Sequence, residues 1–159
     1  MNGWTGKILH INLTTKTAEI ETPTPETYTK WIGGKGLAGT YLRPHIQRSY
    51  DDPLMPLIFM TGPLVNTPSP TSGRMCISSR SPLTGTVGDT SVGGTLGSRI
   101  KQAGWDGFVI TGRSDTPCGL HIEDDQWTIV DAAEFNGLQT SETTKRLKDG
   151  PNGKNRSVV

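Results

Sequence analysis

The chain has 159 residues, a length typical of one domain. Its formal net charge is +1 and its basic residues are scattered, so the extended basic surface that nucleic-acid binding requires is not expected. Only 32% of the residues are hydrophobic, whereas 20 glycines and 11 prolines favour turns. This composition predicts a loop-rich fold with a small core, part of whose apolar surface contacts a neighbouring domain or subunit.

The amino terminus lacks the charged and apolar segments of a signal peptide, and the longest apolar run, 57–60, is far too short to span a bilayer. We therefore expect a soluble, cytoplasmic protein without a membrane partner. Cys76 and Cys118 lie far apart, with no histidine or further cysteine at zinc spacing. An iron–sulfur cluster of the usual kind needs more cysteines than these two, so this chain alone is not expected to ligate one.

The amino-terminal part of the sequence predicts a β-hairpin and two short helices. Apolar residues alternate with polar ones over 9–13 and again over 17–21, which is the period of half-buried strands. Thr24 is a favourable N-cap and Pro25 suits the first helical position, so a helix is expected to begin there. A second helix is expected over about 37–42.

The rest of the chain is predicted to contain more strands than helices. Strands are expected at 56–60, 75–79 and 108–111, an extended segment at 84–90, a hairpin at 119–123 and 127–130, helices at 95–103 and 140–148, a turn at 150–153, and the start of a strand at 156–159. Short connections favour antiparallel pairing. The predicted fold class is therefore α+β, with mostly antiparallel β-sheets and a few short helices.

Glycine-bearing turns are concentrated between Gly62 and Gly97. Glycine lets backbone approach another group closely, and backbone N–H groups in such turns favour anions. The pair at 93–94 precedes a predicted helix, and Arg74 and Arg80 are nearby cations that suit phosphate oxygens. From the residues alone, an ordinary tight strand-to-helix turn is the commoner explanation of this glycine pair.

Other chemistries find little support in the sequence. No Gly-x-Ser-x-Gly elbow is present, so a serine hydrolase is not indicated. His10 and His121 fall on predicted strands without a metal-ligand spacing and are expected to be surface or packing residues. Cys76 is expected to be a small buried residue of a strand.

Several short motifs of the sequence occur in the order and spacing that are typical of one protein family. They are Gly3-Trp4-Thr5-Gly6, Trp31-Ile32-Gly33-Gly34-Lys35-Gly36-Leu37, Gly62-Pro63-Leu64, Ser72-Gly73-Arg74, Ser81-Pro82-Leu83-Thr84-Gly85, Gly93-Gly94 and Ala103-Gly104-Trp105-Asp106. As a set they resemble the amino-terminal domain of the tungsten-dependent aldehyde:ferredoxin oxidoreductases. The resemblance implies one domain over 1–159 that cradles a pterin cofactor and is truncated at its carboxyl end.

The resemblance also implies a cofactor set. Enzymes of this family oxidise aldehydes to carboxylates with water as the oxygen source, and pass electrons through a tungsten or molybdenum bis-pterin and a 4Fe-4S cluster to ferredoxin. By resemblance, Arg74 lies between pterin and cluster, the backbone carbonyl of Ser91 binds a magnesium ion that links two pterins, and Gly93 lies near a pterin phosphate. The family has asparagine where this chain has Ser91, but any residue supplies a carbonyl. No catalytic residue is expected in this chain.

Two hypotheses from different classes follow. The first is that the chain is the amino-terminal domain or small subunit of such an oxidoreductase, inactive alone, whose partners are further domains or a larger subunit carrying the cluster ligands. The second is a non-catalytic module that binds pterin phosphate or serves assembly by docking on a larger subunit. A third, a remnant without function, is the simplest alternative.

Overall fold

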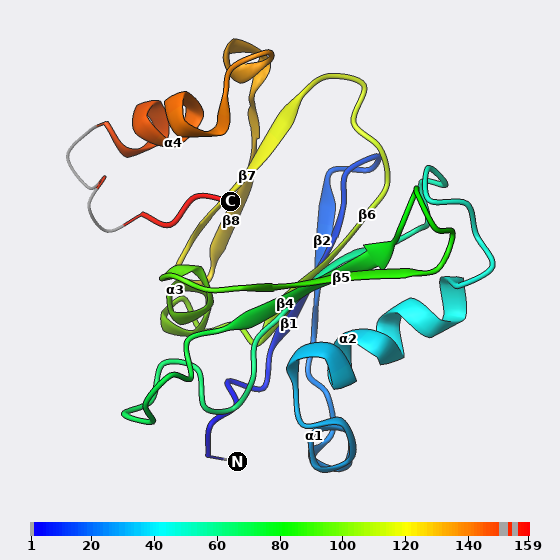
Figure 1. The fold of residues 1–159 in the computed structure, drawn as a ribbon, viewed down its shortest axis with the longest axis vertical. Coiled ribbons are helices and arrows are strands. Elements are labelled where there is room, and N and C mark those ends of the chain that lie inside the picture. The colour runs from blue at the N-terminus through cyan, green and yellow to red at the C-terminus, as the bar shows by residue number, and fades with distance from the viewer. Residues whose placement is uncertain (1, 150–152, 154–155) are drawn as a thin grey trace.

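The structure is a computed structural model that describes residues 2–149, 153 and 156–159. The described residues form two sheets, with helices on both sides of the larger one (Figure 1). The strands are β1 (Ile8–Asn12), β2 (Thr17–Glu21), β3 (Leu57–Met60), β4 (Met75–Arg80), β5 (Val87–Val92), β6 (Gly107–Thr111), β7 (Cys118–Glu123) and β8 (Gln126–Asp131). The helices are α1 (Pro25–Trp31), α2 (Gly34–Leu42), α3 (Leu96–Gln102) and α4 (Thr140–Lys148), with 3-10 turns at Arg43–His45 and Ala133–Phe135.

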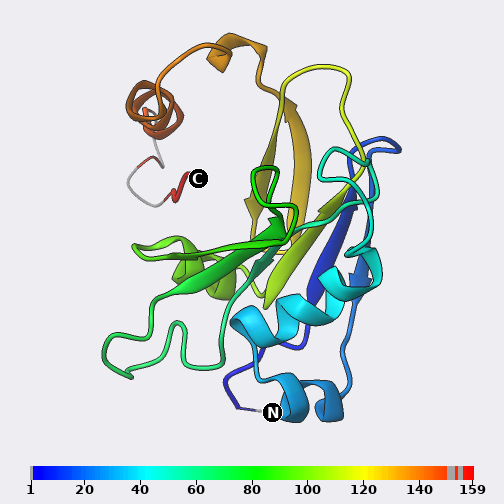
Figure 2. The ribbon, with the colours of Figure 1, turned by 45° about the vertical axis from the view of Figure 1, so that its right-hand side comes forward.

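The larger sheet has six strands in the order β2-β1-β6-β3-β4-β5, and β7 pairs with β8 in a separate hairpin. All pairs are antiparallel except β1 with β6, which run parallel with Ile8 opposite Gly107. The expected α+β class with mostly antiparallel sheet is confirmed. Figure 2 shows β5 on the outer side of the sheet, with the β7–β8 hairpin and α4 extending away from the α1 end.

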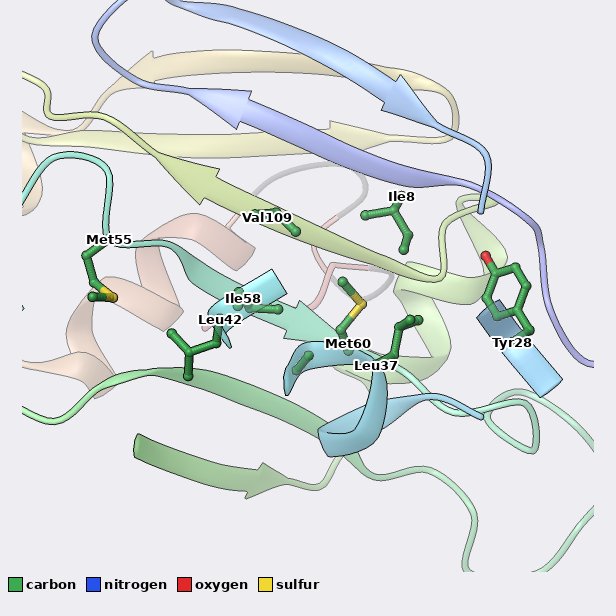
Figure 3. Packing of buried hydrophobic residues seen from close by; sticks show 9 residues of the cluster. Ile8, Tyr28, Leu37, Leu42, Met55, Ile58, Met60 and Val109 are labelled. Carbon is green, nitrogen blue, oxygen red and sulfur yellow. The ribbon is translucent and has the colours of Figure 1, made fainter. Parts of the chain in front are cut away.

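Apolar side chains cover both faces of the larger sheet. On one face, Leu37 and Leu42 of α2 pack with Ile58 and Met60 of β3 (Figure 3). On the other, Leu9 and Ile11 of β1 join a second cluster with α3 and the β7–β8 hairpin. The alternation of apolar residues along β1 and β3 therefore serves two cores, one on each face.

The predicted start of the first helix is confirmed, and its end is unusual. The Thr24 hydroxyl accepts a hydrogen bond from Thr27 N at 3.3 Å. After Trp31 the chain turns sharply at Ile32, whose φ is 63° and ψ is −66°, and Gly33 N donates to Trp31 O at 2.7 Å. This is a strained γ-turn. Helix α2 then begins at Gly34, three residues before the expected position.

The prediction that a strand begins at 156–159 is wrong. These residues have no regular structure, and Ser157 Oγ instead lies 2.6 Å from Thr95 Oγ1 near the start of α3. No described strand pairs with them, and β-structure requires such a partner. Of the expected turn at 150–153, the first three residues lie outside the described part of the chain.

The longest helices, α2 and α4, contain nine residues each. Within the described ranges, no helix has the length and apolar character needed to cross a membrane.

Candidate functional site

Arg74, Ser91 and Gly93 are brought together by the β4–β5 pair. Cys76 lies opposite Ser91 and Met75 opposite Val92, so Arg74 precedes β4 where Gly93 follows β5. The Arg74 guanidinium approaches the Ser91 carbonyl oxygen, with Nη1 at 3.5 Å. All three residues are exposed.

The Ser91 carbonyl lies at the free edge of the sheet. Among the described residues, strand β5 pairs only with β4, and Ser81 N donates to Thr86 O at 2.8 Å at the hairpin end. Antiparallel pairs alternate between bonded and non-bonded residues. Counting along the register from this bonded pair, the backbone N–H and C=O groups of Val87, Asp89 and Ser91 point away from β4. The carbonyl is thus open to a ligand from outside the sheet.

Gly93 leaves space that nothing in the described chain fills. A Cβ added there would meet no atom within 4 Å, and Gly93 does not have a positive φ. Its neighbour Gly94 has φ +78°, which favours glycine for backbone reasons. By contrast, a Cβ on Gly97 would lie 3.3 Å from Gly73 O. Some glycines of this region are therefore explained by internal packing, but Gly93 is not.

The donor set at this edge suits an anionic group with an accompanying hard cation. A guanidinium is permanently charged and can form paired hydrogen bonds with phosphate. A backbone carbonyl is an oxygen ligand of the kind magnesium prefers. Arg74 and a divalent cation would repel each other unless an anion lay between them, so these residues fit a magnesium-bound phosphate better than the bare ion.

An ion pair connects the edge strand to α2. Lys35 Nζ contacts Asp89 Oδ2, two residues before Ser91, and the hydrogen bond to Asp89 raises the pKa of Lys35. The Lys35 side chain remains 61% exposed. This pair adds a second attachment for β5 beside its pairing with β4.

A buried carboxylate that the sequence reasoning did not single out, Asp106, organises the other end of the domain. Asp106 Oδ1 accepts hydrogen bonds from Lys101 Nζ at 2.5 Å and Thr5 N at 3.0 Å, and Oδ2 accepts from Gly6 N at 2.8 Å and the Tyr28 hydroxyl at 2.7 Å. Burial raises the pKa of Asp106, but these donors outweigh burial and hold the pKa below its ordinary value. Burial and the bond to Asp106 raise the pKa of Tyr28 well above its usual range.

Three glycines near the ends of the larger sheet pack tightly against backbone carbonyls of other segments. An added Cβ would lie 2.6 Å from Pro63 O at Gly3, 2.7 Å from Thr61 O at Gly33 and 2.2 Å from Phe59 O at Gly107. These glycines thus allow close contact between backbone segments of the chain itself. The motifs at 3–6 and 103–106 were recognised only as family motifs, and the sequence alone did not predict that they meet.

Cys76 is the buried strand residue that was expected, and His121 is exposed, whereas His10 makes a polar contact with the neighbouring strand. Cys76 is buried in β4, with its Sγ 3.0 Å from Ser78 Oγ. His10 Nε2 lies 2.6 Å from Glu21 Oε2, and the Tyr41 hydroxyl donates to Glu21 Oε1 at 2.9 Å. Within the part of the chain that the structure describes, no three His, Cys, Asp or Glu residues gather in a metal-binding arrangement.

The sequence of the chain matches a family of known proteins. The model of the aldehyde ferredoxin oxidoreductase N-terminal domain matches residues 8–159. The chain is 41% identical to a tungsten-containing aldehyde ferredoxin oxidoreductase of Pyrococcus abyssi, over 94% of this chain and 25% of that protein. It is 32% identical to the WOR-like subunit of an aliphatic sulfonate oxidoreductase of Pyrococcus furiosus, over 92% of this chain and 24% of that protein.

A solved structure shows the same fold. A chain of the active-site complex BamBC of benzoyl coenzyme A reductase, bound to 1,5-dienoyl-CoA, superposes with a TM-score of 0.89 at 28% identity, covering 92% of this chain and 23% of that one. The chain thus spans about a quarter of the length of the relatives it matches. Its sequence and its fold agree that the chain belongs to the aldehyde ferredoxin oxidoreductase family, whose N-terminal domain it matches.

Proposed function

We propose that this chain is the cofactor-binding N-terminal part of a tungsten or molybdenum bis-pterin oxidoreductase that oxidises aldehydes and delivers electrons to ferredoxin. The observation that carries the proposal is the meeting of Arg74, the Ser91 carbonyl and the open Gly93 at the free edge of β5. The expectation for these three positions rests on the family resemblance, from which the side chain of Ser91 departs while its backbone carbonyl remains available. The fold and the relatives support the assignment of the domain.

The relatives favour a cofactor role over a substrate role for this domain. Their names refer to aldehydes, an aliphatic sulfonate and a dienoyl-CoA. Proteins with such different substrates share the fold of this one segment, so the shared segment is best explained by a shared cofactor. Substrate choice would then belong to other parts of those proteins.

Each residue would have a defined task. Arg74 would donate hydrogen bonds to phosphate or pterin oxygens and balance negative charge as a fixed cation, because guanidinium does not deprotonate at working pH. The Ser91 carbonyl would ligate magnesium, and Gly93 would let a phosphate approach the backbone. The bound bis-pterin metal centre supplies the two-electron redox chemistry when present. This chain holds and orients that group, and we propose that it is inactive alone.

Further domains or a larger subunit would supply the ligands of a 4Fe-4S cluster, since the relatives are about four times as long as the matched region. The fold in BamBC, described as an active-site complex, supports a role within an assembly. The same observation also supports a second candidate function, in which the domain is a non-catalytic module that binds pterin phosphate and docks on a larger subunit.

The deciding experiment is a tagged purification from the native host with tungsten, molybdenum and iron measured in the product. We expect metal and a large co-purifying polypeptide with the wild-type chain. Arg74→Gln should lower the metal content about tenfold, as for loss of one charge-assisted contact. Ser91→Ala is the matched control and should leave the metal content unchanged, because it keeps the backbone carbonyl.

Recovery of a folded, metal-free chain without a partner would overturn the enzyme assignment. If that free chain still bound a pterin phosphate, the module would be favoured. Equal metal loss in the Ser91→Ala variant would contradict the backbone role given to Ser91.

A further inference from the structure

A groove between α2 and the free edge of β5 is unexplained by the proposed cofactor site. It has a volume of about 260 Å³ and is lined by residues of α2, the following 3-10 turn and the β4–β5 pair. Its apolar walls include Leu42, Ile46 and Val87, and its rim carries Lys35, Arg43 and Asp89. Val87 remains 52% exposed.

Gly39 is one of the residues that line this groove. It lies in the middle of α2, where glycine disfavours the helix. An added Cβ would meet nothing within 4 Å, and the backbone of Gly39 does not have a positive φ. Neither internal packing nor backbone geometry therefore accounts for glycine here. The open space beside Gly39 leaves room for a group from outside the chain.

The adjacent edge offers unpaired backbone groups. The N–H and C=O groups of Val87 and Asp89 point away from β4, and their side chains share the sheet face of Ser78, which lines the groove. A strand added to β5 would lie about 4.8 Å away and would direct alternate side chains toward the α2 side. One such side chain would sit over Gly39.

The charged residues that line the groove indicate which kind of segment would bind there. Lys35 is paired with Asp89. Arg43 has no carboxylate within salt-bridge distance among the described residues, and the guanidinium of Arg80 donates to the Ile46 carbonyl rather than to an acid. The groove is thus lined by apolar side chains and by one cation, Arg43, that has no acidic partner among the described residues. An acidic segment is complementary to it.

We propose that this groove and the Val87–Asp89 edge bind an extended, acidic segment of the larger protein, which adds a strand to β5. The segment would place one apolar side chain over Gly39 and a carboxylate beside Arg43, a mode of recognition known as β-augmentation. The relatives have about three quarters of their length outside the region that this chain matches, so such a segment is available in them. The proposal does not depend on cofactor binding, because the added strand would pair with Val87–Asp89, and Ser91 and Gly93 lie beyond these residues.

The test uses the full 159-residue chain and short overlapping peptides that tile the unmatched part of the Pyrococcus abyssi relative. At least one peptide with alternating apolar and acidic residues is expected to bind and to slow amide hydrogen exchange at Val87 and Asp89. Gly39→Leu should weaken that binding about tenfold by filling the groove. Gly39→Ala is the matched control and should have a much smaller effect, since a methyl group occupies little of it.

Charge is tested separately. Arg43→Glu should weaken binding about tenfold, and Arg113→Glu, at an exposed site away from the groove, should not. Arg74→Gln should leave peptide binding unchanged, which separates failure of this proposal from failure of the proposed function. Circular dichroism of each variant establishes that the fold is intact.

Three results would overturn the proposal. The first is that no peptide binds. The second is that binding is unaffected by Gly39→Leu in a folded variant, or protects a region other than β5. The third is that the chain forms a dimer with β5 protected, which would make a second copy the occupant.

Discussion

Replacing Asp106 by asparagine should cost a large part of the stability of this domain. Asp106 is 1% exposed and its only counter-charge among the described residues, Lys101, has a side chain that is 5% exposed. The substitution leaves that cation buried without its partner, and it turns an amide N–H₂ donor toward groups that previously donated to a carboxylate oxygen and have now lost that acceptor. Loss of one partner of a buried pair typically costs about 3–5 kcal/mol. Against a total of about 5–15 kcal/mol, this approaches unfolding.

Urea unfolding followed by tryptophan fluorescence measures the effect. With a slope of about 2 kcal/mol per molar urea, the midpoint should fall by about 2 M. The double variant Asp106→Asn with Lys101→Met removes the unpaired cation, so it should be more stable than Asp106→Asn alone. A midpoint shift below about 0.5 M, or strictly additive effects in the double variant, would refute the view that the buried pair holds the domain together.

The remaining predictions concern pH and backbone geometry. Because the folded-state pKa of Asp106 lies below its ordinary value, its contribution is complete above about pH 5 and is lost as the pH falls through that pKa; urea titrations at pH 5 and pH 3 should show a drop that Asp106→Asn lacks. Gly107→Ala should destabilise by about 1–3 kcal/mol, since its Cβ would lie 2.2 Å from Phe59 O; an unchanged urea midpoint would contradict this contact. Ile32→Gly should raise the melting temperature by about 3 °C by relieving a strained φ of 63° at a side chain that is 59% exposed, and a lower value would show that Ile32 makes contacts worth more than the strain. Gly39→Ala should stabilise the isolated chain by about 1 kcal/mol through helix propensity, and destabilisation would show that the site is internally packed.

Signals of short range were sufficient for most of the fold. The Thr24 cap, the alternation along β1 and β2, and the hairpin at 119–130 each depend on neighbours in sequence, and each is confirmed. The proximity of Arg74 to Ser91 was expected only from the family resemblance, and in the structure it results from the pairing of β4 with β5.

Contacts between distant segments could not be predicted in this way. The parallel pairing of β1 with β6 and the ligation of Asp106 by Thr5, Gly6 and Tyr28 join residues that no periodicity relates. A strand pattern at 156–159 was likewise insufficient, since a strand requires a partner that local sequence does not supply.

The parallel β1–β6 pair also sets the order in which a newly made chain can fold. Strand β1 can pair with β2 as soon as β2 has been made, but its other neighbour, β6, begins only at Gly107. The backbone N–H of Thr5 likewise has no acceptor until Asp106 has been made. At about 5–20 residues per second, the ribosome takes roughly 5–20 s to make the intervening chain. During that interval the apolar Leu9 and Ile11 lack their cover from the second core cluster. Until β6 emerges and completes the sheet, the nascent domain therefore exposes an unpaired edge of β1 together with these apolar side chains.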